Sequence, residues 1–170
     1  MSAPNLTSPS VGIANPPDAK QGKRRWLVVG ALVLVLVVSV ALPVIFLPIS
    51  EDVTGAHTAF HVLGILTCIA GVILLHLLRP GATRTVAVMS WIVTVFLIAW
   101  LIGHLGELAT VFTHGGVAHD SDTFDQSGHM VFASIAVPSW MLAILSFVVL
   151  LLTIAIQAIA RRARTPHRRS

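Results

Sequence analysis

The sequence predicts an all-α integral membrane protein, a bundle of four transmembrane helices with its N and C termini in the cytoplasm. Three observations lead to this fold class. Of the 170 residues, 55% are hydrophobic and only 11% are charged, and the mean hydropathy is +0.87. Because a soluble domain averages about 25% charged residues, this composition excludes a soluble globular protein. The apolar residues are also collected in four long blocks, and the basic residues lie only at alternate ends of those blocks.

Each apolar block is long enough for a transmembrane helix. The hydrocarbon layer of a membrane is about 30 Å thick, which takes about 20 helical residues to cross. A segment in that layer must satisfy its own backbone hydrogen bonds, as a helix does. A transmembrane β-barrel would show short alternating segments, which this sequence lacks. The predicted helices cover residues 26–49, 57–78, 86–112 and 130–160.

The segments outside the predicted transmembrane domain, residues 26–160, differ in composition. Residues 1–25 are rich in Ser, Pro, Asn and Gly, which predicts a disordered cytoplasmic tail. The basic cluster at residues 23–25 could begin a signal peptide, but the apolar run after it exceeds the roughly 7–15 residues of such a peptide, and no small-x-small cleavage site follows. We therefore expect a retained first helix. Residues 161–170 predict a short basic cytoplasmic tail.

The basic residues predict the orientation in the membrane. All eleven Lys and Arg precede the first block, follow the fourth, or lie in the tight hairpin at residues 79–84 between the second and third. Since cytoplasmic loops carry the excess of Lys and Arg, both termini and this hairpin should face the cytoplasm. The pI near 10.7 then reflects orientation and attraction to lipid headgroups, and no nucleic-acid partner is expected. The Val-, Ala- and Arg-rich composition favours the plasma membrane of a bacterium.

Histidine is the residue type that points to function. Six of the eight histidines lie in the predicted outer half, together with Glu107. Ionisable residues at membrane depth are costly and usually face a bundle interior or a water-filled cavity. With a rise of 1.5 Å per residue, His61 lies roughly 6 Å below His57, and Glu107 and His104 lie roughly 7.5 and 12 Å below the outer end of the third helix. His129 begins the fourth helix, so three helices bring polar side chains to one level.

Three kinds of site are compatible with this convergence. Haem b needs two imidazoles from facing helices and an apolar pocket, and His61 could provide one with His104 or His129 as the other. A first-row transition metal, Zn, Cu or Fe, binds imidazole and carboxylate groups. A proton relay or pH sensor needs no cofactor, because histidine titrates in the physiological range. The alternative to all three is a set of histidines that only bond to backbone carbonyls or cap helix ends.

Several side chains could build these sites. The candidate metal ligands are His57, His61, His104, Glu107, His114, His119 and His129. The aromatic wall of a haem pocket would come from Phe60, Trp100, Phe132 or Trp140. Small residues beside the polar ones would either let helices approach closely or leave room for a flat cofactor; they are Gly64, Gly103, Gly106, Ala133 and Ala136.

The predicted outer loop, residues 113–128, is long for a connection between helices. Loops above about 12 residues are often functional or disordered. His114, His119 and three aspartates in this loop could gather a divalent transition-metal ion from outside. Calcium is only weakly indicated, because no Gly or terminal Glu follows at the offsets of a calcium loop. A solvated acidic loop is the alternative.

Catalysis has little support in the sequence. The single cysteine, Cys68, excludes a disulfide framework and a cysteine-based zinc or iron–sulfur site. It lies at mid-membrane depth, where no water stabilises a thiolate, so we expect it to serve packing. The sequence has no Ser-His-Asp arrangement on the helices and no HExxH motif.

In helix count and histidine placement, residues 26–160 are similar to the small four-helix membrane b-type cytochromes, without a shared motif string. That resemblance implies haem near helix ends and assigns no ligand. The leading hypothesis is a redox or accessory membrane protein that binds haem b or a transition metal near its extracytoplasmic face. One alternative is a proton- or metal-coupled transporter that uses Glu107 and the histidines. Another is a non-catalytic subunit or scaffold of a larger membrane complex, and the expected partners are the lipid bilayer, a membrane protein or a second copy of the chain.

Overall fold

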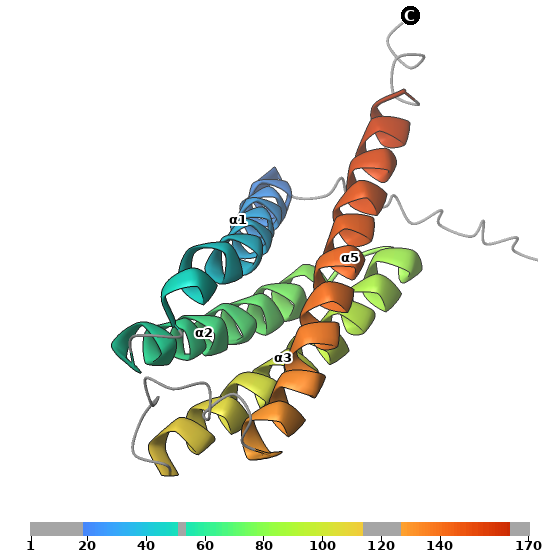
Figure 1. The fold of residues 1–170 in the computed structure, drawn as a ribbon. Helices are drawn as coiled ribbons and strands as arrows, with labels where there is room; N and C mark the ends of the chain where they lie inside the picture. Colours follow the sequence, from blue (N-terminus) through green and yellow to red (C-terminus); the bar gives the residue numbers. More distant parts are fainter. Residues whose placement is uncertain (1–18, 51–53, 114–126, 164–170) are drawn as a thin grey trace, which may run out of the picture.

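A computed structural model of the chain describes residues 19–50, 54–113 and 127–163. Apart from the turn at residues 79–83, these ranges are helical, and they contain no strand. The helices are α1 (Ala19–Ser50), α2 (Thr54–Leu78), α3 (Arg84–Thr113) and α5 (Ser127–Ala163), arranged as a bundle (Figure 1). Each of the four is long and apolar enough to cross a membrane. The predicted fold class, an all-α bundle of four membrane-competent helices, is therefore confirmed.

The helices extend beyond their predicted boundaries. α1 begins at Ala19, so residues 19–25 of the predicted disordered tail are helical. α5 runs on to Ala163, so Arg161 and Arg162 of the predicted basic tail are helical. The apolar pattern marks only the part of a helix that lies in lipid, whereas the backbone hydrogen bonds can continue into water. The rest of the two tails and most of the predicted outer loop (residues 1–18, 114–126 and 164–170) lie outside the described residues.

The order of the helices brings alternate segments to the same end of the bundle. The start of α1, the turn between α2 and α3, and the end of α5 line one common cavity. The turn is the tight hairpin that the sequence predicts: Ala82 N donates to Arg79 O at 3.0 Å, and Gly81 has a φ of 71°, which glycine adopts without steric cost. These segments carry the basic residues, so we name this the arginine end. The side of the membrane that it faces stays a prediction from the positive charges.

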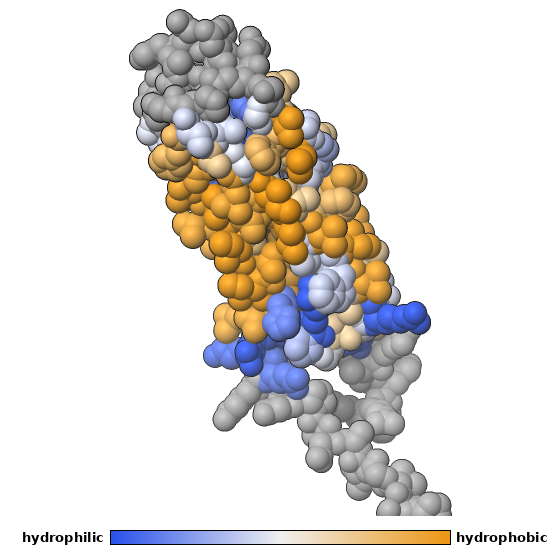
Figure 2. Space-filling view, turned by 90° about the horizontal axis from the view of Figure 1, so that it is seen from below, coloured by the Kyte–Doolittle hydropathy of each residue, from blue (hydrophilic) through white to orange (hydrophobic). Residues whose placement is uncertain are grey.

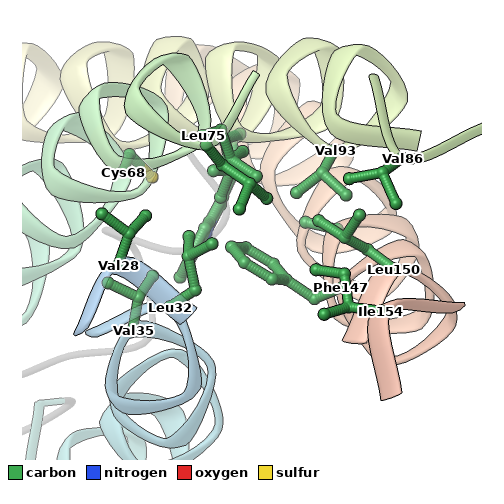
Figure 3. Packing of buried hydrophobic residues seen from close by; sticks show 14 of the residues in the cluster. Val28, Leu32, Val35, Cys68, Leu75, Val86, Val93, Phe147, Leu150 and Ile154 are labelled. Carbon is green, nitrogen blue, oxygen red and sulfur yellow. The ribbon is translucent and has the colours of Figure 1, made fainter. Parts of the chain in front are cut away.

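Packing is closest between neighbouring helices in the order α1, α2, α3, α5. α3 packs against both α2 and α5, and α2 packs against α1, whereas α1 and α5 meet only locally. All four helices contribute side chains to an apolar core (Figure 3). The Phe147 ring of α5 lies next to Gly71 of α2. Cys68 is fully buried in this core, in agreement with a packing role. The outside is apolar as well, as the broad hydrophobic belt in Figure 2 shows.

A proline in α1 explains how α1 is tied to α5. Pro43 cannot donate a backbone hydrogen bond, so the carbonyl of Ser39, four residues earlier, has no helical partner. The indole Nε1 of Trp140 donates to this oxygen at 2.8 Å. An unpaired carbonyl in an apolar layer is costly. The bond therefore stabilises the point at which α1 and α5 meet.

The crossing of α3 and α5 depends on Gly103. A Cβ built on Gly103 would lie 2.6 Å from the Cβ and 2.8 Å from the Cα of Ala136. Because backbone cannot move aside as a side chain can, Gly103→Ala is expected to lower the free energy of unfolding by about 1–3 kcal/mol. Unfolding in SDS, followed by circular dichroism, measures the loss. Gly30→Ala on α1 is the control, since nothing lies within 4 Å of its Cβ position, and an equal loss in both variants would contradict the tight crossing.

Candidate functional site

The end of the bundle opposite to the arginine end holds a group of buried polar side chains. α2 contributes His57 and His61, α3 contributes His104 and Glu107, and α5 contributes His129. We name these five residues the histidine cluster. His61 and His104 are almost fully enclosed, with 0% and 1% of their surface exposed. The structure thus brings together five of the seven candidate ligands named from the sequence; the other two, His114 and His119, lie outside the described residues.

The spacing of the polar residues explains why they meet. His57 and His61 are four residues apart on α2, and His104 and Glu107 are three apart on α3. Residues at these separations share one face of a helix. In each helix that face is turned towards the other helix and α5. In the structure, the three helices bring these polar side chains to one level, as the helical rise predicts.

His61 is the centre of the cluster. Its Nδ1 faces Nδ1 of His104 at 2.9 Å, and its Nε2 faces Nε2 of His57 at 2.9 Å. The carboxylate Oε2 of Glu107 lies 3.4 Å from the same Nε2. A neutral imidazole carries one N–H donor and one acceptor nitrogen. His61 can therefore donate to one histidine neighbour and accept from the other, and a proton carried on its Nε2 also lies within reach of Glu107.

Aromatic rings and His129 surround this centre. The ring of Phe60 lies 5.2 Å, centroid to centroid, from both His61 and His104. The Trp100 ring is 5.0 Å from the His104 ring. On the side of α5, the His129 ring is 5.8 Å from that of His57. The cluster is thus shielded by apolar rings, which strengthens the electrostatic interactions inside it.

Two glycines make room for the cluster and its wall. A Cβ on Gly64 of α2 would overlap the His104 ring, and Nε2 is the ring atom that it would approach most closely. A Cβ on Gly106 of α3 would overlap the ring of Phe132. Sequence reasoning identified both glycines as small residues, but it could not tell which ring each one admits. Phe132 packs on Gly106 and does not line the cavity that lies beside the histidine cluster.

A cavity of about 310 Å³ lies beside the cluster, close to the lower limit of the roughly 300–1,000 Å³ typical of ligand pockets. Four cluster members border it, and His61 does not. The remaining wall is almost entirely apolar and includes three of the four aromatic residues suggested from the sequence. The lining residues are Pro43, His57, Phe60, Trp100, His104, Glu107, His129, Met130, Ala133, Ala136, Val137 and Trp140. Pro43, Met130 and Val137 were not foreseen, since nothing in their local pattern marks a cavity.

The arrangement also bears on the cofactors predicted above. Among the residues that the structure describes, no three of His, Cys, Asp and Glu are placed so that they could hold one metal ion. Instead, ring nitrogens of the cluster face one another. Because the facing nitrogens of His61 and His104 are 2.9 Å apart, a porphyrin does not fit between these two rings as they lie here. The Nδ1 atom of His104 faces His61, and its Nε2 atom lies against Gly64.

No protein-family model matches the chain, and no curated protein or solved structure is significantly similar to it. The similarity to membrane b-type cytochromes therefore rests on helix count and histidine placement alone. The function has to be inferred from the buried polar groups themselves.

Proposed function

We propose that the chain is a proton-linked membrane protein: the histidine cluster takes up protons from one side of the membrane, and their uptake changes how α2, α3 and α5 pack. The observation that carries the proposal is the row of direct ring contacts from His104 through His61 to His57, with Glu107 beside the middle ring. Buried ionisable groups in membrane helices are costly and usually functional. Histidine is also the side chain that titrates near neutral pH.

The row of imidazoles can pass a proton with little movement of the side chains. When all three rings are neutral, each facing pair needs one N–H and one lone pair. His57 can donate to His61 and His61 to His104, or both bonds can run the other way. A proton that enters at one end of the row converts the first order into the second when one proton shifts at each contact and another leaves at the far end. Glu107 can hold the proton carried by His61 Nε2.

Protonation of all three rings, in contrast, weakens the packing of the helices around them. If all three rings become imidazolium ions, each contact sets an N–H against an N–H, and neighbouring charges repel. Glu107 offsets one of these charges, and His129 adds another from α5. The described part of α1 has its titratable residues only at positions 20–25, at the arginine end. We therefore expect acid to separate α2, α3 and α5 at the histidine end.

The core beyond the cluster argues against a simple proton channel. Cys68, Leu97 and Phe147 lie buried in the middle of the bundle, where they form part of the apolar core. A proton needs hydrogen-bonding groups or water along its path, and these side chains supply neither. This favours a factor that couples proton uptake to a conformational change over a transporter that conducts protons freely.

The proposal is tested by measuring helix separation as a function of pH. Spin labels are attached to Val62→Cys on α2 and Val131→Cys on α5, both exposed near the histidine end, in a Cys68→Ala background in lipid nanodiscs. Double electron–electron resonance is expected to give a longer distance at pH 5 than at pH 8. Labels at Ile73→Cys and Ile156→Cys, exposed nearer the arginine end, form the control pair.

The two label pairs distinguish a local change from a global one. The control distance is expected to stay constant, because that part of the bundle is held by the apolar core. An unchanged distance in the first pair between pH 8 and pH 5 would overturn the proposal. So would an equal increase in both pairs, since it would indicate general unfolding in acid.

Haem b is a second candidate, favoured by the apolar cavity with its aromatic wall beside His57 and His129. When bound, haem would supply electron transfer at its iron, and His57 and His129 would hold it through their imidazoles in the apolar cavity. The absorption spectrum of protein expressed with added haem precursor tests this candidate. A Soret band that is lost in His129→Ala and kept in His76→Ala would support it. The absence of a Soret band from the wild-type protein would reject it, and elemental analysis of the same preparation tests for Zn, Cu or Fe.

A further inference from the structure

The cavity beside the histidine cluster combines buried polar groups with an apolar wall. Four ionisable side chains line it, His57, His104, Glu107 and His129, and each has at most 7% of its surface exposed. The rest of the lining is almost entirely apolar. Pockets that bind small molecules typically have this composition, a mostly apolar wall with a few polar groups that orient the ligand. A ligand of this cavity therefore needs a polar edge and an apolar body.

The cavity reaches the lipid-facing surface of α5. Met130 and Val137 line it, yet 55% and 54% of their surfaces are exposed. With a rise of 1.5 Å per residue, Val137 lies about 15 Å from the start of α5 at Ser127, inside the apolar span. Pro43 lines the cavity from α1, which meets α5 only locally. These positions indicate a mouth between α1 and α5, where a molecule dissolved in the bilayer can enter.

Aromatic side chains give the apolar wall a preference for a flat ligand. Phe60, Trp100 and Trp140 contribute rings from three different helices. An aromatic pair in an offset-stacked or edge-to-face arrangement contributes about 0.5–1.5 kcal/mol beyond the area that it buries. The volume of about 310 Å³ accommodates a head group of one or two fused rings. A long apolar tail has to extend through the mouth into the bilayer.

The polar groups of the cavity can serve both as donors and as acceptors of hydrogen bonds. A neutral imidazole carries one nitrogen of each kind, and a carboxyl group accepts when ionised and donates when protonated. A quinone presents two carbonyl oxygens, which accept hydrogen bonds, and its reduced form presents two hydroxyl groups, which also donate. Both forms match imidazoles and a carboxyl group. A fatty acid also has a suitable polar head, but it has no flat ring for the aromatic wall.

We propose that this cavity binds a lipid-soluble quinone. The ring lies among the aromatic side chains, one of its oxygens is within hydrogen-bonding reach of the histidines and Glu107, and the tail extends into the bilayer between α1 and α5. Binding needs only the cavity, whereas a link between the ligand and proton uptake rests on the proton-linked function proposed above.

Tryptophan fluorescence measures this binding, because a quinone quenches the emission of a nearby indole. Of the four tryptophans, Trp100 and Trp140 line the cavity, whereas Trp26 and Trp91 are exposed and do not. Full-length protein with Trp26→Phe and Trp91→Phe, prepared without added haem precursor, is titrated in lipid nanodiscs at pH 8 with decylubiquinone. We expect quenching that saturates. Quenching that only rises in proportion to the quinone, as for free diffusion in lipid, would overturn the proposal.

A pair of matched variants locates the site. Ala133 lines the cavity from α5, so Ala133→Leu fills part of the space and is expected to weaken the saturable quenching at least tenfold. Ala155→Leu makes the same change on the same helix, at an exposed position that does not line the cavity, and should leave binding unchanged. Circular dichroism establishes that both variants keep their helices. An equal effect of the two variants would contradict binding in this cavity.

A matched competitor tests the polar contacts without any variant in the cavity. The dimethyl ether of reduced decylubiquinone keeps the ring and the tail but has neither carbonyl nor hydroxyl groups. We expect it to displace the quinone only at a concentration at least tenfold above that at which the quinone itself binds. Displacement by the ether at equal concentration would overturn the proposal in favour of a general apolar pocket, and displacement by oleate in favour of a fatty-acid site.

These outcomes are independent of the distance measurements at pH 5 and pH 8. Saturable quenching together with an unchanged distance between the labels on α2 and α5 would support the quinone site and reject proton-linked function. A longer distance in acid without saturable quenching would do the reverse.

Discussion

Replacement of His61 by alanine is expected to lower the free energy of unfolding by about 3 kcal/mol or more. The imidazole of His61 is fully buried and faces His57, His104 and Glu107. Its removal leaves a void, takes a hydrogen-bond partner from two buried histidines, and removes the ring nitrogen that lies 3.4 Å from the carboxyl group of Glu107. Each buried group left unsatisfied costs about 1–3 kcal/mol, and the void adds to this cost. Unfolding in SDS at pH 8, followed by circular dichroism, measures the loss.

His76→Ala is the matched control for this experiment. His76 lies on the same helix, is exposed and is near the opposite end of α2. A surface substitution of this kind usually changes stability by less than about 0.5 kcal/mol. If His61→Ala cost no more than His76→Ala, the histidine cluster would not be the packed network described above.

Replacement of Glu107 by glutamine is expected to shift the acid-induced helix separation to lower pH. Glutamine keeps the size of the side chain and can still form a hydrogen bond, but it removes the carboxylate 3.4 Å from His61 Nε2. An opposite charge at this distance typically favours protonation of a neighbour by about 1–3 pH units. Without the carboxylate, the cluster must take up its protons against a larger electrostatic cost. The midpoint of the Val62–Val131 distance change should therefore fall by about 1 pH unit or more.

The same label pair supplies the control. In His76→Gln the midpoint should equal that of the wild-type protein, because His76 is remote from the cluster. An unchanged midpoint in Glu107→Gln would remove Glu107 from the proton-linked unit. Circular dichroism at pH 8 establishes that the glutamine variant keeps its helices before the titration begins.

Much of this architecture follows from properties of single helices. Length and hydropathy are sufficient to predict four membrane-competent helices, because the membrane sets a minimum apolar length. The separations of His57 from His61 and of His104 from Glu107 are sufficient to place each pair on one helix face. For that reason the membership of the cluster could be predicted, although His114 and His119 lie outside the described residues.

The contacts between helices could not be predicted in the same way. Whether His61 faces His104 or a cofactor depends on how α2 and α3 are rotated about their axes, and no single-helix pattern encodes that rotation. Gly64 illustrates the difficulty, because the side chain that it lacks would occupy the space taken by the His104 ring. The bond from Trp140 to the Ser39 carbonyl is a second example, because it joins residues 101 positions apart. Pro43 was a local signal for the free carbonyl, but not for the donor that reaches it.

The helix ends show a third limit of sequence patterns. Residues 19–25 are polar and basic, which resembles a disordered tail, yet they continue α1. Their position next to the end of α5 is what creates the arginine-lined cavity. A composition that indicates only orientation in the membrane thus also brings basic residues of two helices to one cavity.

The decisive measurement is the protonation of the cluster itself, by ¹⁵N solid-state NMR of histidine-labelled protein in lipid bilayers. Ring-nitrogen shifts, assigned with single His→Gln variants, are followed from pH 8 to pH 5. Protonation of a coupled unit predicts that His57, His61 and His104 change together, with N–H···N bonded signals at pH 8 that disappear in acid. If the His61 signals stayed the same over this range, or if the three histidines titrated independently of one another, proton-linked function of the cluster would be contradicted.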